Sequence, residues 1–140
     1  MLSSLRWIGP SLIPALLLRN NFTPRGDVPA HTKVLSLHTD KDGLVVVEQE
    51  HSYQSVMPAA NLATAIAVEA APSHCGFTQA ELVSGWESLR GWVATGVKPG
   101  VPQIQGLCSA LAAGGMASGP CRFNPAYVIN DLDTRILPRW

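Results

Sequence analysis

The sequence predicts an α/β chain in which crossover helices connect the strands of a short parallel sheet. Two short β-prone runs, 34–38 and 63–69, each precede a segment of helical character. The order strand, helix, strand, helix is typical of parallel strands joined by crossovers. The chain has 140 residues, of which 46% are hydrophobic, so it has the length of one domain and enough apolar residues for a buried core.

Turn-forming residues bound the first strand and the helix after it. The strand at 34–38 runs into the stretch 39–43, where Thr, Asp, Lys and Gly favour a turn. Residues 48–56 have helical character, and Pro58 ends this helix because proline lacks an N–H donor and clashes with the preceding turn. The run at 63–69 is read as the second strand, although its alanines would also suit a helix.

A capped helix follows the second strand. Thr78 and Glu81 have the spacing of a capping box, and Gly96 supplies a residue that can close the helix in the left-handed conformation. Apolar residues between these ends recur at the spacing of one helical face. They are Leu82, Val83, Trp86, Leu89, Trp92 and Val93. This pattern predicts that Trp86 and Trp92 belong to the core, and the alternative is that they anchor an interface with a partner.

The rest of the chain divides into a loop-rich end and an apolar beginning. Within the Gly-, Ala- and Pro-rich stretch 98–125 we expect one helix, at about 103–113. The expected organisation is an apolar N-terminal segment at 1–23, a main unit at 24–125 and a C-terminal tail at 126–140. The first segment has the outline of a signal peptide, but prolines interrupt it and no cleavage site follows, so location in the cytoplasm and export both stay open.

Composition excludes some partners. Ten basic residues balance ten acidic ones, and a net charge of zero removes the main attraction for nucleic acid or for an anionic membrane surface. The apolar stretch in the first segment is too short and interrupted to span a bilayer. Charged residues make up only 14% of the chain, which predicts that some apolar surface faces a partner.

Two loops follow the predicted strands, and each carries a side chain suited to proton transfer. Asp42 lies after the first strand and His74 after the second, 32 residues later. The carboxyl ends of parallel strands meet at one edge of a sheet, where α/β proteins build their sites. An acid that orients an imidazole, and an imidazole that moves a proton, are two members of a hydrolytic triad. Asp40 is the alternative acid.

With these loops, the chain resembles the C-terminal part of an α/β-hydrolase, where a strand ending in His-x-x-x-Asp supplies the triad acid and a later His loop the base. The residues that match are His38 and Asp42, and then His74 in the run His-Cys-Gly-Phe-Thr; the resemblance covers about residues 24–125. It implies a partial α/β-hydrolase fold and carboxylesterase-like hydrolysis of a small-molecule ester. Asp42 would be the acid and His74 the base.

The sequence departs from this family at the nucleophile. Family members carry a serine on a Gly-x-Ser-x-Gly elbow ahead of the acid. The serines before Asp42, none of them flanked by glycines in this way, are Ser3, Ser4, Ser11 and Ser36. The nucleophile is therefore unidentified or absent. Cys108, in Gly-Leu-Cys-Ser-Ala, is similar to the cysteine elbow of dienelactone hydrolases. The alternative is a Cys108–Cys121 disulfide, which leaves Cys75 unpaired, either as a small buried hydrophobic residue or, beside His74, as a reactive thiolate.

Two functions of different classes follow from the sequence. One is an ester hydrolase that uses the Asp-His pair, and the other is a non-catalytic hydrolase fragment that acts as an oligomerising interaction module. Because two or three parallel strands are marginal alone, we expect a homo-oligomer or a complementing chain in either case. No cofactor or metal is expected, because the four histidines lack a zinc-ligand spacing and the stretch 40–43 lacks the later glutamate of a calcium loop.

Overall fold

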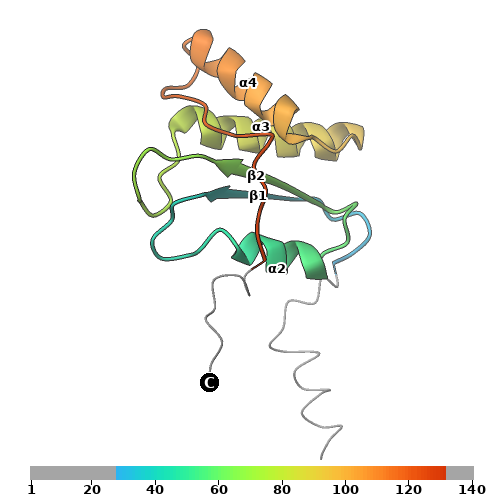
Figure 1. Cartoon of the computed structure of the whole chain (residues 1–140). Coiled ribbons are helices and arrows are strands. Elements are labelled where there is room, and N and C mark those ends of the chain that lie inside the picture. The colour runs from blue at the N-terminus through green and yellow to red at the C-terminus, as the bar shows by residue number, and fades with distance from the viewer. Residues whose placement is uncertain (1–27, 132–140) are drawn as a thin grey trace, which may run out of the picture.

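The computed structural model describes residues 28–131 and has the mixed α/β content that the sequence predicts. The predicted N-terminal segment 1–23 and the end of the predicted tail, from residue 132, lie outside the described residues. Figure 1 shows the elements in chain order. They are β1 (Val34–Thr39), α2 (Gln49–Val56), β2 (Leu62–Ala67), α3 (Gln79–Thr95) and α4 (Val101–Ala113).

The two strands form a parallel sheet, as predicted. Their register pairs Val34 with Leu62 and Thr39 with Ala67. Helix α2 lies on one side of the sheet, and α3 and α4 lie on the other (Figure 1). The outer edge of β2 is met by the C-terminal segment, since the Val68 N–H donates to the Arg122 carbonyl at 3.0 Å. This antiparallel contact was not predicted, because its stretch of chain is rich in glycine and proline and shows no strand pattern.

The core lies between the sheet and helices α3 and α4. Its buried residues are Ala65, Ala67, Ala80, Ile104, Cys108, Leu111, Ala117 and Phe123. Helix α3 comes close to β1 because Gly85 has no side chain there: an added Cβ would lie 2.6 Å from Cδ1 of Leu37. A larger residue at position 85 would therefore force the Leu37 side chain to move.

The core-facing side of α3 differs from the predicted one. Trp92 is buried as expected, with 1% of its surface exposed, but Trp86 is 61% exposed. The prediction that Trp86 belongs to the core is therefore wrong. The helix packs through Ala80, Ser84 and Gly85 instead, together with a buried carboxylate. Small residues let α3 come closer to the sheet than large apolar ones would. Hydrophobic periodicity alone therefore predicted the wrong side of the helix for Trp86.

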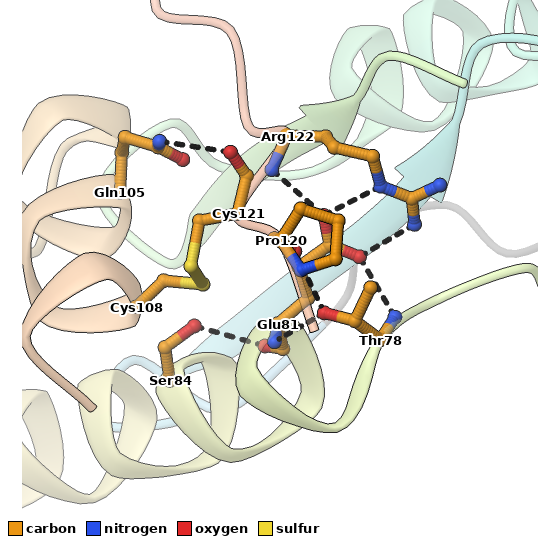
Figure 2. Close-up of a disulfide and its surroundings, with 8 residues drawn as sticks. All are labelled: Thr78, Glu81, Ser84, Gln105, Cys108, Pro120, Cys121 and Arg122. Atoms are coloured by element: carbon orange, nitrogen blue, oxygen red, sulfur yellow. Dashed lines mark hydrogen bonds and ion pairs between the residues drawn. A yellow bond between two sulfur atoms is a disulfide. The ribbon is translucent and has the colours of Figure 1, made fainter. Parts of the chain in front are cut away.

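The buried carboxylate belongs to Glu81, which completes the predicted capping box. Its Oε2 accepts the Thr78 N–H at 2.9 Å, and Oγ1 of Thr78 accepts the Glu81 N–H at 3.2 Å. Arg122 donates through Nε and Nη2 to the same carboxylate, at 3.0 and 2.7 Å (Figure 2). Burial by itself would raise the pKa of Glu81, but the hydrogen bonds from Arg122 and Thr78 outweigh it and lower that pKa below 4.5.

A disulfide joins α4 to the segment that carries Arg122. Cys108 and Cys121 are bonded, with Cα atoms 5.8 Å apart, and the Cys121 carbonyl accepts from Nε2 of Gln105 at 3.1 Å (Figure 2). The predicted disulfide is therefore confirmed, and Cys108 is not the nucleophile, because this residue is fully buried and its sulfur is already bonded. In the range 28–131, none of the helices combines the length and the apolar character that crossing a membrane requires.

Candidate active site

Asp42 and His74 lie in direct contact at the carboxyl edge of the sheet. Nδ1 of His74 is 2.9 Å from Oδ2 and 3.0 Å from Oδ1 of Asp42. The two side chains come from the loops after β1 and β2. Two residues that are 32 positions apart in the sequence thus meet at the predicted edge of the sheet.

Backbone hydrogen bonds between these loops account for the contact. The Gly43 N–H donates to the Ser73 carbonyl at 3.2 Å, and the Ser73 N–H donates to the Lys41 carbonyl at 3.3 Å. They form a parallel bridge between Asp42 and Ser73 beyond the ends of the two strands. The parallel pairing of the two chain segments therefore resumes beyond the strand ends, and it places Asp42 next to the loop that carries His74.

The Asp42 carboxylate is held by the turn in which it lies. Its Oδ1 accepts the N–H groups of Leu44 at 2.8 Å and Val45 at 2.9 Å, and only 5% of the side chain is exposed. The N–H of Val45 first, and then those of Leu44 and the His74 ring, lower the pKa of Asp42 well below its ordinary range, against the opposing effect of desolvation. At neutral pH this carboxylate is ionised and fixed in orientation.

The ring of His74 is half exposed, and the carboxylate fixes its tautomer. An ionised carboxylate can only accept hydrogen bonds, so Nδ1 carries the proton and the lone pair of the neutral ring is on Nε2. The side chain is 48% exposed. Among the described residues, no oxygen or nitrogen donates to Nε2, which leaves this atom available to take a proton from an incoming group.

Cys75 is the free cysteine, and it is exposed, so the prediction of a small buried hydrophobic residue is wrong. Its φ of 52° places it in the left-handed region, and its sulfur lies 3.6 Å from Nε2 and 3.9 Å from Nδ1 of His74. Because these two distances are nearly equal, the sulfur lies beside the ring rather than along the Nε2 lone pair. In this position the thiol is not placed to give its proton to the imidazole.

Asp40, the alternative acid, has a structural contact instead. Its Oδ1 accepts the N–H of Glu69 at 2.7 Å, and its own N–H donates to the Ala67 carbonyl at 3.1 Å. These bonds connect the end of β1 to the chain just after β2. Asp42 is therefore the aspartate that contacts the histidine.

Two charged side chains that are far apart in the sequence, Glu69 and Arg122, form hydrogen bonds with the loop that carries His74. Oε1 of the buried Glu69 accepts from the Ser73 hydroxyl, and Nη2 of Arg122 donates to the Gly76 carbonyl at 2.6 Å. A Cβ on Gly76 would lie 2.0 Å from the Ser73 Oγ, so a larger residue there would displace the Ser73 hydroxyl from Glu69. The role of Arg122 was not predicted, because a lone arginine in a Gly- and Pro-rich stretch gives no local signal.

Asp42, His74 and Cys75 also form a group that could hold a metal ion, since one ligand atom from each lies within 4.8 Å of the others. The spacing of the histidines does not reveal this cluster, because only one of its three groups is a histidine. The hydrogen bond between Asp42 and His74 already accounts for the proximity of two of the three groups. The cluster is therefore compatible with a metal but does not by itself indicate one.

No hydroxyl of residues 28–131 is hydrogen-bonded to His74, so a serine nucleophile is not part of the described site. No family model, curated protein or solved structure matches this chain.

Proposed function

We propose that the chain supplies the acid and the base of an ester hydrolase, with Asp42 as the acid and His74 as the base. The observation that carries this proposal is the contact between Nδ1 of His74 and an immobilised, ionised Asp42 carboxylate, in a histidine whose side chain is about half exposed. The nucleophile comes from outside the described residues. The resemblance to the C-terminal part of an α/β-hydrolase supports the same roles.

In the proposed reaction, Nε2 of His74 removes the proton from a nucleophilic hydroxyl as its oxygen attacks the ester carbonyl. The carbonyl–alkoxy bond then breaks, and the proton on Nε2 passes to the departing alcohol. A water molecule releases the acyl group by the same sequence of proton transfers. Asp42 keeps Nδ1 protonated and stabilises the imidazolium that forms in each half-reaction.

The placement of the two groups favours catalysis over a purely structural pairing. An aspartate that only stabilised this turn would need no more than the hydrogen bonds from the N–H groups of Leu44 and Val45, which Asp42 already accepts. The histidine adds little burial, since about half of its side chain is exposed. An exposed imidazole fixed by a nearly buried carboxylate is the arrangement that a general base requires.

The test is the hydrolysis of a short-chain nitrophenyl ester by the full chain and by His74→Gln. A positioned general base contributes about a hundredfold or more, so we expect the rate to fall by at least that factor. Asp42→Asn should lower the rate as well, because the amide no longer fixes the tautomer.

His51 provides a matched control. It is also an exposed histidine beside an aspartate, with Nδ1 3.9 Å from Asp131. His51→Gln, purified in the same way, should retain the wild-type rate. A rate that His74→Gln leaves unchanged, or that falls equally in His51→Gln, would contradict the proposal and would indicate a contaminating hydrolase or non-specific imidazole catalysis.

A further inference from the structure

The two strands of the sheet differ in how well they are covered. Five of the six residues of β2 are buried, whereas five of the six residues of β1 are only partly buried. The outer edge of β2 is met by residues 122–124. Among the described residues, no segment pairs with the outer edge of β1.

The open edge of β1 offers backbone groups for pairing. The N–H groups of Val34 and Asp40 donate toward the β2 side, to the carbonyls of Asn61 and Ala67. Backbone groups alternate in direction along a strand, so those of Leu35 and Leu37 point to the open edge. An edge with unpaired backbone groups is a template for another strand.

An apolar stripe on α3 lies beside this edge. It consists of Leu82, Trp86, Leu89 and Val93, of which all but the partly buried Leu89 are more than half exposed. Helix α4 packs against the opposite flank of α3, and α3 contacts β1 while α4 contacts β2. The stripe and the β1 edge therefore form one continuous surface.

We propose that this surface is a twofold interface between two copies of the chain. In this dimer the β1 strands lie antiparallel, edge to edge, and the two α3 helices lie antiparallel on the same side of the joined sheet. The spacing of the stripe, four, three and four residues, is that of a coiled-coil seam. It reads the same in both directions, so Leu82 meets Val93 of the second copy and Trp86 meets Leu89.

Shape and charge favour a second copy as the occupant. A shallow hollow on α3 is lined by Trp86 together with Leu89 and Val93, and in the proposed dimer the same three side chains of the second copy face it. Glu87 and Arg90, paired at 2.8 Å, border the same flank. A twofold axis places both signs of charge on both sides of the interface, and two chains of zero net charge do not repel each other.

The test is the oligomeric state of the full chain, measured by sedimentation equilibrium. The wild type should be a dimer, and Trp86→Glu should raise its dissociation constant by about 30-fold or more, as expected for a central tryptophan. Met116→Glu is the matched control, because Met116 is similarly exposed, at 67%, but lies outside the surface. It should leave the dissociation constant unchanged. A monomeric wild type, or an association that Trp86→Glu does not weaken, would overturn the proposal.

Crosslinking tests the register independently of stability. With Cys75 replaced by serine, Leu82→Cys and Val93→Cys in the same chain should give a dimer covalently linked between positions 82 and 93. The two positions lie about 16 Å apart along one helix, too far for a bond within a chain. Peptide mapping that finds only 82–82 and 93–93 links would overturn the antiparallel arrangement.

Discussion

Removal of the Cys108–Cys121 bond provides a quantitative test of how the C-terminal segment is held. The bond closes a loop across a sequence separation of 13. In the chain-entropy treatment, a crosslink of this length stabilises the fold by about 3 kcal/mol, because it restricts the unfolded chain. We expect the double variant Cys108→Ala/Cys121→Ala to lose that amount of unfolding free energy.

Urea unfolding followed by tryptophan fluorescence and far-UV circular dichroism provides the measurement. For a chain of this size, a loss of about 3 kcal/mol lowers the midpoint by roughly 1–2 M urea. The wild type in the presence of a reductant should shift to the same midpoint. Cys75→Ser is the control for thiol loss, since Cys75 is free and exposed, and its midpoint should stay at the oxidised wild-type value.

Two results would refute the reasoning. A midpoint that moves by less than a third of the expected shift would mean that the contacts of Arg122 hold the segment without the crosslink. If Cys75→Ser without reductant had the same lowered midpoint as the reduced wild type, the free thiol, and not the buried bond, would account for the effect of the reductant.

Two further substitutions test the support of the site. Glu81→Gln should cost about 3 kcal/mol at neutral pH, because Arg122 loses its buried partner, whereas the exposed Glu87→Gln should cost little. Because folding lowers the pKa of Glu81, the ionised carboxylate contributes its full share of the unfolding free energy above pH 4.5, and this share is lost as the pH falls below that value. The melting temperature of Glu81→Gln should therefore fall less on acidification than that of the wild type. Gly76→Ala should destabilise the chain by about 1–3 kcal/mol, because its Cβ clashes with Ser73, and it should slow ester hydrolysis. Gly43→Ala is the control, since an added Cβ there meets nothing within 4 Å. An equal effect in both variants would contradict the steric reason.

Local signals predicted the parts of the fold that depend on neighbouring residues. The capping box at Thr78, the helix end at Gly96 and the strand–helix order each express a preference of the nearby backbone. The pair Asp42 and His74 was also found, because parallel strands bring their carboxyl ends together whatever lies between them.

The features that the sequence analysis missed depend on packing over long separations. The apolar stripe with Trp86 looked like a core face, and nothing local shows that small residues and a paired Glu81 would occupy the core-facing side of α3 instead. Arg122 lies 46 residues from Gly76, whose carbonyl it binds. Only the tertiary fold brings such groups together, so no periodic pattern reveals them.

The disulfide also determines what a protease could separate from this molecule. Between α4 and Cys121 the chain passes through an exposed turn at Gly114 and Gly115, where Gly115 has a positive φ of 68°. Exposed, glycine-rich turns are preferred sites of cleavage. A cut there would leave the segment with Arg122 covalently attached to α4, so the nicked chain would keep its mass under non-reducing conditions and release a C-terminal fragment only after reduction.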